Sequence, residues 1–132
     1  MSRYLLDTNI LIFSMNAPER LSGIGEKILT NPENEVFVSV VSLIEIAIKV
    51  GLSKLELPMP IAELPATLLR NSMAIVDLDA ATSLGLASLP LYNRDPYDRL
   101  LVVQASRLDA TLLTSDQPLT VYAEHVSLRT VR

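Results

Sequence analysis

The 132-residue sequence contains no cysteine and a single histidine, His125. Without cysteine the chain forms no disulfide bond and has no thiolate to bind zinc, which fits a reducing compartment. With one histidine it supports neither a nuclease mechanism that uses two histidines nor a histidine-rich zinc site. These absences exclude several common kinds of catalytic and metal site.

Nucleotide-binding and membrane-spanning patterns are also missing. The sequence has neither the GxxxxGK[ST] phosphate loop nor the GxGxxG dinucleotide motif. Every apolar run is interrupted by charge well before the roughly 18 residues that a transmembrane helix requires. The N-terminus reaches Asp7 too soon to form the apolar segment of a signal peptide. We therefore expect a cytoplasmic protein that does not span a membrane.

The charge balance is acidic, with 11 Lys and Arg against 15 Asp and Glu and a net charge of −4. The chain lacks the broad basic surface of a tight nucleic-acid binder, so contact with nucleic acid would need a bound cation to reverse the local charge. Hydrophobic residues make up 49% of the chain and charged residues 20%, which excludes disorder. Without an internal repeat or long linker, residues 1–132 fit one domain.

Short apolar runs alternate with helical patterns along the chain. The runs are too short and too uniformly apolar for strands with one face in water, which favours strands covered on both faces. The predicted strands are residues 3–6, 36–39, 74–78, 111–113 and 126–131. The predicted helices are residues 22–30, the segment from Ser39 or Ser42 to about Val50, and residues 62–71, 80–89 and 96–108. This alternation predicts an α/β fold with a central parallel sheet flanked by helices.

Four acidic residues occupy comparable places in this pattern. Asp7 comes directly after a predicted strand, and Asp116 lies three residues after another. Glu45 lies in the first turns of a helix that follows a strand, and Asp98 lies in the first turn after Pro96. Because ligands of open parallel sheets bind outside the carboxyl ends of the strands, we expect all four carboxylates near that edge.

Each acid also has a purely structural explanation. Asp7 and Asp116 are suited to cap helices or turns, the commoner role of an isolated aspartate in such places. Glu45 and Lys49 are spaced for a helical ion pair worth roughly 0.3 to 0.5 kcal/mol. Asp98 complements a helix dipole. Considered singly these roles are favoured, whereas four acids collected at one edge favour a shared cation.

A shared cation follows from the electrostatics of crowded carboxylates. Such groups raise each other's pKa unless a cation lies between them, and the sequence places no lysine cluster near these acids. Oxygen ligands alone suit Mg²⁺ or Mn²⁺, and Mg²⁺ sites commonly combine carboxylates with substrate phosphates. The pattern therefore indicates chemistry on a phosphate ester.

Four segments carry a resemblance to a known family. They are LLDTNIL (5–11), SVVSLIEIAIKVGLSKLELP (39–58), LPLYNRDPYDRLLVVQA (89–105) and TLLTSDQPL (111–119). In this order they resemble a PIN domain, and in particular the VapC toxin ribonucleases of bacterial toxin–antitoxin pairs. DTN alone would be a weak signal, but the four segments together span nearly the whole chain.

The resemblance implies an active site as well as a fold. It implies that Asp7, Glu45, Asp98 and Asp116 hold one or two Mg²⁺ or Mn²⁺ ions, with Asp7 and Asp98 as the expected direct ligands. Polar residues beside the acids are expected to orient these ligands or metal-bound water: Asn9, Ser115, Thr8 and Thr114.

The resemblance also implies an activity and partners. The expected reaction is metal-dependent RNA hydrolysis by an activated water, which leaves a 5′-phosphate and a 3′-hydroxyl. The expected partners are an RNA substrate, a small cognate antitoxin that blocks the acidic pocket, and a second copy of the chain. Ile44 stands where relatives often have an aromatic residue, and Tyr92 and Asn93 where they often have histidines.

Neighbouring residues receive structural roles. We expect Asp95 to cap the helix that Pro96 begins and Arg99 to face solvent. We expect Glu45 to point over the strand edge toward the cation while the neighbouring isoleucines pack against the sheet: Ile44, Ile46 and Ile48.

Two other functions are compatible with parts of the sequence. One is a PIN-like module that binds RNA or protein without cutting, against which the complete set of acids argues. The other is a phosphatase with an aspartate nucleophile, because LLDTN resembles the strand-end motif of haloacid-dehalogenase-like enzymes. That motif requires a second aspartate two residues after Asp7, where this chain has Asn9.

Overall fold

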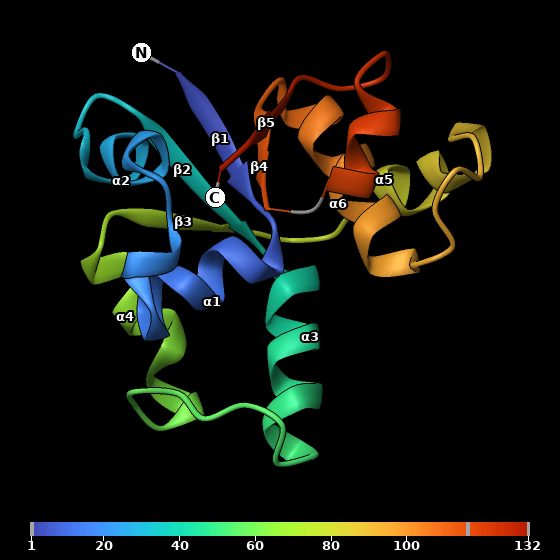
Figure 1. Cartoon of the computed structure of the whole chain (residues 1–132). Helices are drawn as coiled ribbons and strands as arrows, with labels where there is room; N and C mark the ends of the chain where they lie inside the picture. The colour runs from blue at the N-terminus through green and yellow to red at the C-terminus, as the bar shows by residue number, and fades with distance from the viewer. Residues whose placement is uncertain (1, 116, 132) are drawn as a thin grey trace.

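The computed structural model describes residues 2–115 and 117–131 of the chain. Its strands are β1 (Arg3–Leu6), β2 (Glu35–Ser39), β3 (Met73–Val76), β4 (Thr111–Thr114) and β5 (Leu128–Thr130). They form one sheet in the order β3-β2-β1-β4-β5, in which all neighbouring strands are parallel (Figure 1). The predicted α/β fold with a central parallel sheet is confirmed.

Helices connect the strands. The α-helices are α1 (Thr8–Asn16), α2 (Gly23–Thr30), α3 (Val40–Gly51), α4 (Leu64–Arg70), α5 (Ala80–Leu84) and α6 (Pro96–Leu108). Short 3₁₀ helices are η1 (Pro18–Arg20), η2 (Ile61–Glu63), η3 (Gly85–Ser88) and η4 (Gln117–Tyr122). Side chains cap α2 and α3: Ser22 accepts a hydrogen bond from Gly25 N, and Ser39 accepts one from Val41 N.

Four predicted elements are shorter than expected. The helix expected over residues 62–71 is α-helical only from Leu64 to Arg70, and the strand expected over residues 74–78 runs from Met73 to Val76. The helix expected over residues 80–89 is α-helical only to Leu84 and continues as η3. At Gly85 the chain approaches α6 closely, because a Cβ added there would lie 2.7 Å from a methyl carbon of Val103. The strand expected over residues 126–131 pairs with β4 only from Leu128 to Thr130.

The apolar residues form a core on each face of the sheet. Leu6 and Leu113 belong to the core formed with α1, α2 and α4, whereas Leu5 and Leu112 belong to the core formed with α6 and η4. All four are fully buried. Successive strand residues point to opposite faces, so uniformly apolar strands require this double cover.

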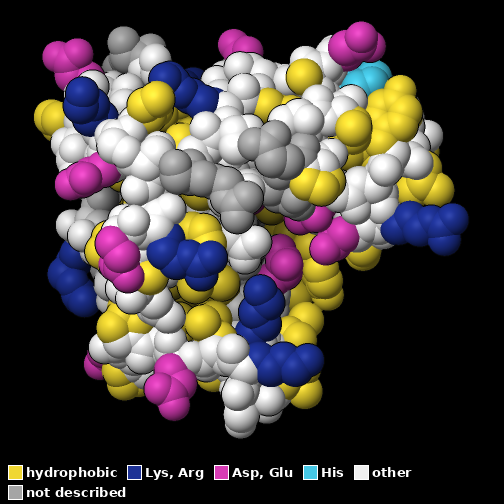
Figure 2. Space-filling view, in the orientation of Figure 1, with side chains coloured by type: hydrophobic (Ala, Val, Ile, Leu, Met, Phe, Trp, Pro, Cys, Tyr) yellow, Lys and Arg dark blue, Asp and Glu magenta, His cyan; other side chains and the backbone are white. Residues whose placement is uncertain are grey.

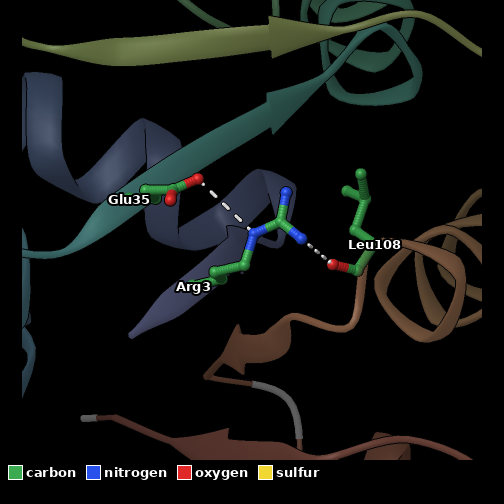
Figure 3. A network of polar contacts seen from close by, with 3 residues as sticks. All are labelled: Arg3, Glu35 and Leu108. Carbon is green, nitrogen blue, oxygen red and sulfur yellow. Dashed lines mark hydrogen bonds and ion pairs between the residues drawn. The ribbon is translucent and has the colours of Figure 1, made fainter. Parts of the chain in front are cut away.

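Figure 3 shows polar contacts at the edge of the sheet where β1 and β2 begin. The Arg3 guanidinium lies 3.4 Å from a Glu35 carboxylate oxygen and donates to Leu108 O at 2.6 Å. It also lies 5.0 Å from the centre of the Phe37 ring. The side chains of Arg3 and Glu35 are 41% and 44% exposed, so we expect about 1 kcal/mol or less from this ion pair.

The helix α3 extends beyond the strand ends rather than lying along the sheet (Figure 1). Only one side of it meets the protein core: Ile46 is fully buried, whereas Ile44 is 45% and Ile48 is 44% exposed. The prediction that all three isoleucines pack against the sheet is therefore wrong. Within the described ranges, no helix is both long and apolar enough to cross a membrane.

Candidate active site at the strand ends

The order of the strands places acids that are distant in sequence at the same edge of the sheet. The chain places β2 on one side of β1 and β4 on the other, so the direction of winding changes beside β1. Helices that follow strands begin at the carboxyl edge of the sheet, and α6 runs back toward β4 with its own first turn at that edge. Such a switch point is where open parallel sheets bind ligands. Asp7, Glu45 and Asp98 come from these three places.

Asp7 sits at the carboxyl end of β1 and is only 4% exposed. Its Oδ1 accepts a hydrogen bond from Ile10 N at 2.8 Å and caps α1, so the capping role considered from the sequence is confirmed. Its Oδ2 accepts a hydrogen bond from the Thr114 hydroxyl at the end of β4. Capping thus occupies one oxygen, while the other faces the neighbouring strand end.

Glu45 is held by the hydroxyl group of Thr8, which also contacts Ser42. The Thr8 hydroxyl donates to Glu45 Oε1 at 2.5 Å and lies 2.9 Å from Ser42 Oγ. Thr8 and Ser42 are both buried, which fixes the side of α3 on which the carboxylate lies. The alternative ion pair with Lys49 has no contact within 4 Å among the described residues, although the lysine charge still acts on Glu45.

Asp98 lies in the first turn of α6, as predicted, and is half-buried. The Asn93 side-chain amide donates to Asp98 Oδ2 at 3.3 Å. Asp95 caps α6 by accepting hydrogen bonds from Tyr97 N at 2.9 Å and from Asp98 N at 3.4 Å, which confirms its predicted role. Two residues just before α6 therefore fix the helix start and one candidate carboxylate: Asp95 caps the helix, and Asn93 hydrogen-bonds to Asp98.

The remaining predicted residues are placed differently. Thr114 is buried and donates a hydrogen bond to Asp7, and Ser115 is also buried, whereas Asn9 is exposed. Asp116 lies outside the described residues. Arg99 is half-buried and donates to the carbonyl oxygens of Leu86 and Leu89, so the expectation that it faces solvent is wrong.

The charges at this edge act on one another. Burial raises the pKa of Glu45 above its usual value, and the neighbouring charges of Asp95 and Asp7 raise it further. The Thr8 hydrogen bond and the Lys49 charge act in the opposite direction. Figure 2 shows acidic side chains gathered where α3 leaves the sheet, with basic side chains farther along α3.

The donor atoms suit a hard divalent cation, because they are carboxylate and hydroxyl oxygens. Within residues 2–115 and 117–131, no three His, Cys, Asp or Glu side chains lie close enough together to hold an ion. Three of the four predicted acids, Asp7, Glu45 and Asp98, lie within these residues. Burial is the main cause of the raised pKa of Glu45, and the smaller contribution of Asp95 and Asp7 is a like-charge repulsion that a bound cation would relieve.

Replacing Glu45 with glutamine is expected to stabilise the metal-free protein at neutral pH. Since the pKa of Glu45 is raised on folding, its ionisation opposes folding, and this cost appears as the pH rises through the ordinary carboxyl range toward the folded value. Glutamine keeps the acceptor for Thr8 but carries no charge. Thermal unfolding of both proteins from pH 4 to 8 in EDTA checks this; equal pH dependence would contradict it.

Three contacts at the site escaped the sequence analysis. Ser39 and Ser42 are the two possible starts of their helix in the sequence, but Ser39 caps it and Ser42 packs against Thr8. Asn93 contacts Asp98, and the charge of Asp95 acts on Glu45. The only sequence signal for these roles was the position of Asn93 and Asp95 just before the acidic helix start.

The fold and the site define an all-parallel α/β protein with carboxylates at its topological switch point. The family model described as PIN domain matches residues 4–124. The chain therefore belongs to the PIN domain family. No curated protein matches the sequence.

Solved toxin–antitoxin structures have the same fold. A chain in the structure of VapBC2 from Rickettsia felis, bound to a promoter DNA fragment, is 20% identical with a TM-score of 0.72, covering 98% of this chain and 99% of that chain. For DNA-bound VapBC from Salmonella typhimurium the identity is 19% and the TM-score 0.71, with 98% of each chain covered. For VapBC-5 from Mycobacterium tuberculosis the identity is 17% and the TM-score 0.60, with 100% of this chain and 99% of that chain covered.

Proposed function

We propose that the chain is a metal-dependent endoribonuclease and the VapC-type toxin of a toxin–antitoxin pair. The observation that carries this proposal is that Asp7, Glu45 and Asp98 lie at one edge of the sheet, each with a side-chain hydrogen bond of its own, and that the charge of Asp7 acts on Glu45. Membership of the PIN domain family and the fold shared with VapBC structures support it. We propose that residues 1–132 act as a single domain in the cytoplasm.

The proposed cofactor is Mg²⁺ or Mn²⁺, held by Asp7, Glu45, Asp98 and Asp116. When bound, such an ion lowers the pKa of a water molecule and offsets negative charge on the scissile phosphodiester. It also gives an acidic site a means of attracting a phosphate backbone. Asp7 and Asp98 are proposed as the direct ligands.

The protein's own hydrogen bonds are proposed to fix the carboxylates before metal and RNA arrive. Thr114 holds Oδ2 of Asp7, Thr8 holds Glu45, and Asn93 holds Asp98. Preorganised ligands lose little conformational freedom on binding, and the partners of metal ligands contribute measurably to affinity. Asn9 and Ser115 are proposed to act on metal-bound water or substrate.

Purified protein, separated from any bound inhibitor, tests this function directly. With Mg²⁺ and total RNA, we expect internal cuts whose downstream fragments carry a 5′-phosphate and whose upstream fragments carry a 3′-hydroxyl. Ligation-based sequencing with and without prior phosphorylation distinguishes these ends. Fragments ending in a 2′,3′-cyclic phosphate would show that the RNA 2′-hydroxyl, and not water, is the nucleophile.

A cavity at the end of α1 farther from Asp7 is proposed to receive the antitoxin. It has a volume of about 710 Å³ and lies between α1, α2, α4 and the loop before η2, with apolar side chains that include Met15, Leu29, Met59 and Leu68. Met15 lies on the helix that begins at Asp7, and at 1.5 Å per residue the two are about 12 Å apart. An apolar partner segment in this cavity would therefore lie within reach of the acids.

Replacing Met59 with glutamate is expected to weaken binding of the cognate antitoxin by roughly 10-fold or more, because a charge would be buried against an apolar segment. Met59 lies in a loop and is half-buried, so the fold should tolerate the change. Calorimetric titration with Met59→Leu as the matched control measures the effect. Unchanged affinity, with RNA cleavage intact, would place the antitoxin elsewhere.

A homodimer is proposed from the outer face of α3. Ile44, Ile48 and Leu52 follow one another at intervals of four residues, and each is between 44% and 60% exposed. This spacing forms one continuous apolar stripe on the helix. Light scattering of the chain after size exclusion tests the proposal, and a monomeric mass at micromolar concentration would contradict it.

A further inference from the structure

One buried phenol hydroxyl, that of Tyr122, makes three hydrogen bonds to the backbone of the loop before α6. Tyr122, at the end of η4, is fully buried. Its hydroxyl donates to Pro90 O at 2.9 Å and accepts hydrogen bonds from Tyr92 N at 3.2 Å and Asn93 N at 3.1 Å. Three backbone groups of residues 90–93 thus converge on one oxygen that lies about 30 residues away in sequence.

The same loop presents one side chain to the candidate metal site. Asn93 Oδ1 accepts a hydrogen bond from Asp95 N at 2.8 Å. Because a backbone N–H can only donate, the amide oxygen must face Asp95, and the amide nitrogen is left to donate to Asp98 Oδ2 at 3.3 Å. The orientation of the Asn93 side chain is therefore defined by the loop backbone on one side and by the carboxylate on the other.

We propose that Tyr122 is a positioning residue for the metal site: its hydroxyl fixes the backbone of residues 90–93, so that the Asn93 amide holds the Asp98 carboxylate in place. This inference rests on the proposed function, because it takes Asp98 as a ligand of Mg²⁺ or Mn²⁺. The loop is fastened independently at its start, where Arg99 donates to Leu89 O at 2.9 Å. Tyr122 controls the part of the loop nearest Asp98.

Removing the hydroxyl alone separates this role from packing. Tyr122→Phe keeps the buried ring and its contact with the Tyr92 ring, whose centre lies 5.4 Å away, but leaves three backbone groups without their common partner. Tyr4→Phe is the matched control, because Tyr4 is also buried but lies on β1 in the core on the other face of the sheet. Asn93→Ala removes the last link of the proposed chain.

The first measurement uses metal-free protein and NMR. In Tyr122→Phe, we expect the Asn93 side-chain amide signals to move toward solvent-like shifts and the backbone amides of Tyr92 and Asn93 to exchange faster with solvent. In Tyr4→Phe these signals should stay unchanged. If the Asn93 side-chain signals are the same in Tyr122→Phe as in the wild type, the positioning role is overturned.

The second measurement is Mn²⁺ affinity by titration calorimetry. Partners of metal ligands typically contribute 10- to 100-fold to affinity, so we expect Asn93→Ala and Tyr122→Phe each to weaken Mn²⁺ binding by roughly 10-fold. The double variant should be no weaker than the weaker single variant, because both act through one contact. RNA cleavage at saturating Mn²⁺ should recover in Tyr122→Phe, since Asp98 itself is retained.

The outcomes separate the inference from the proposed function. A wild type that cuts RNA, together with unchanged Mn²⁺ affinity in Tyr122→Phe, overturns the inference only. A wild type that binds Mn²⁺ without cutting RNA, with weaker binding in Tyr122→Phe, supports the inference and overturns the nuclease assignment. Additive losses in the double variant overturn the link through Asn93. Absence of Mn²⁺ binding in the wild type overturns both.

Discussion

Asp98→Asn is expected to reduce RNA cleavage by at least about 100-fold, because the partners of metal ligands alone are commonly worth 10- to 100-fold and Asp98 is a proposed ligand itself. Asparagine keeps the size of the side chain and one oxygen acceptor, but it removes the negative charge that would bind the cation. The loss should appear in kcat at saturating RNA and should be accompanied by weaker Mn²⁺ binding. Initial rates with a labelled RNA and titration calorimetry measure the two effects.

The same helix provides a matched control. Asp109 ends α6 with φ of 52°, a left-handed conformation that asparagine adopts readily, so Asp109→Asn makes the same chemical change without strain. It lies eleven residues after Asp98, about 16 Å along the helix axis. We expect cleavage by Asp109→Asn to equal that of the wild type. Equal activity in both variants would exclude Asp98 from the reaction.

Removing divalent metal is expected to stop cleavage altogether. After EDTA treatment and dialysis the rate should fall to background, and Mg²⁺ or Mn²⁺ should restore it. The metal should also raise the melting temperature, since it binds the folded state and relieves the repulsion that Asp7 and Asp95 exert on Glu45. Cleavage and thermal unfolding, followed over the same metal titration, measure both effects.

Asp98→Asn provides the control for this titration as well. Its melting temperature should respond less to Mg²⁺ than that of the wild type, because part of the binding site is lost. Full cleavage in excess EDTA would rule out the metal mechanism. A thermal response to metal without any cleavage would favour the second function considered from the sequence, a PIN-like module that binds without cutting.

Most of the fold follows from local sequence signals. Strand β1 is an apolar run that ends at a helix-capping aspartate, and α6 starts at Asp95-Pro96. Both boundaries are therefore determined by residues that are adjacent in sequence. The exposed isoleucines of α3 were predicted wrongly, because the projection of the helix past the sheet depends on which strands lie beside β2. The early end of α5 depends on a close approach to Val103 of another helix.

The site was predictable in outline only. The positions of Asp7 and Asp98 after a strand and at a helix start were sufficient to expect them at one edge. Their partners were not predictable, since Thr114 lies 107 residues from Asp7 and Thr8 lies 37 residues from Glu45. Such contacts depend on strand order and side-chain rotamers, which no short motif encodes.

The most direct test is a crystal of the protein soaked in Mn²⁺ and measured with anomalous X-ray scattering. If the acids at the strand ends share a divalent cation, a strong anomalous peak will lie within bonding distance of Asp7 and Asp98 at the carboxyl edge of β1. Absence of a peak at that edge at millimolar Mn²⁺, in crystals whose site is open to solvent, would contradict the shared cation.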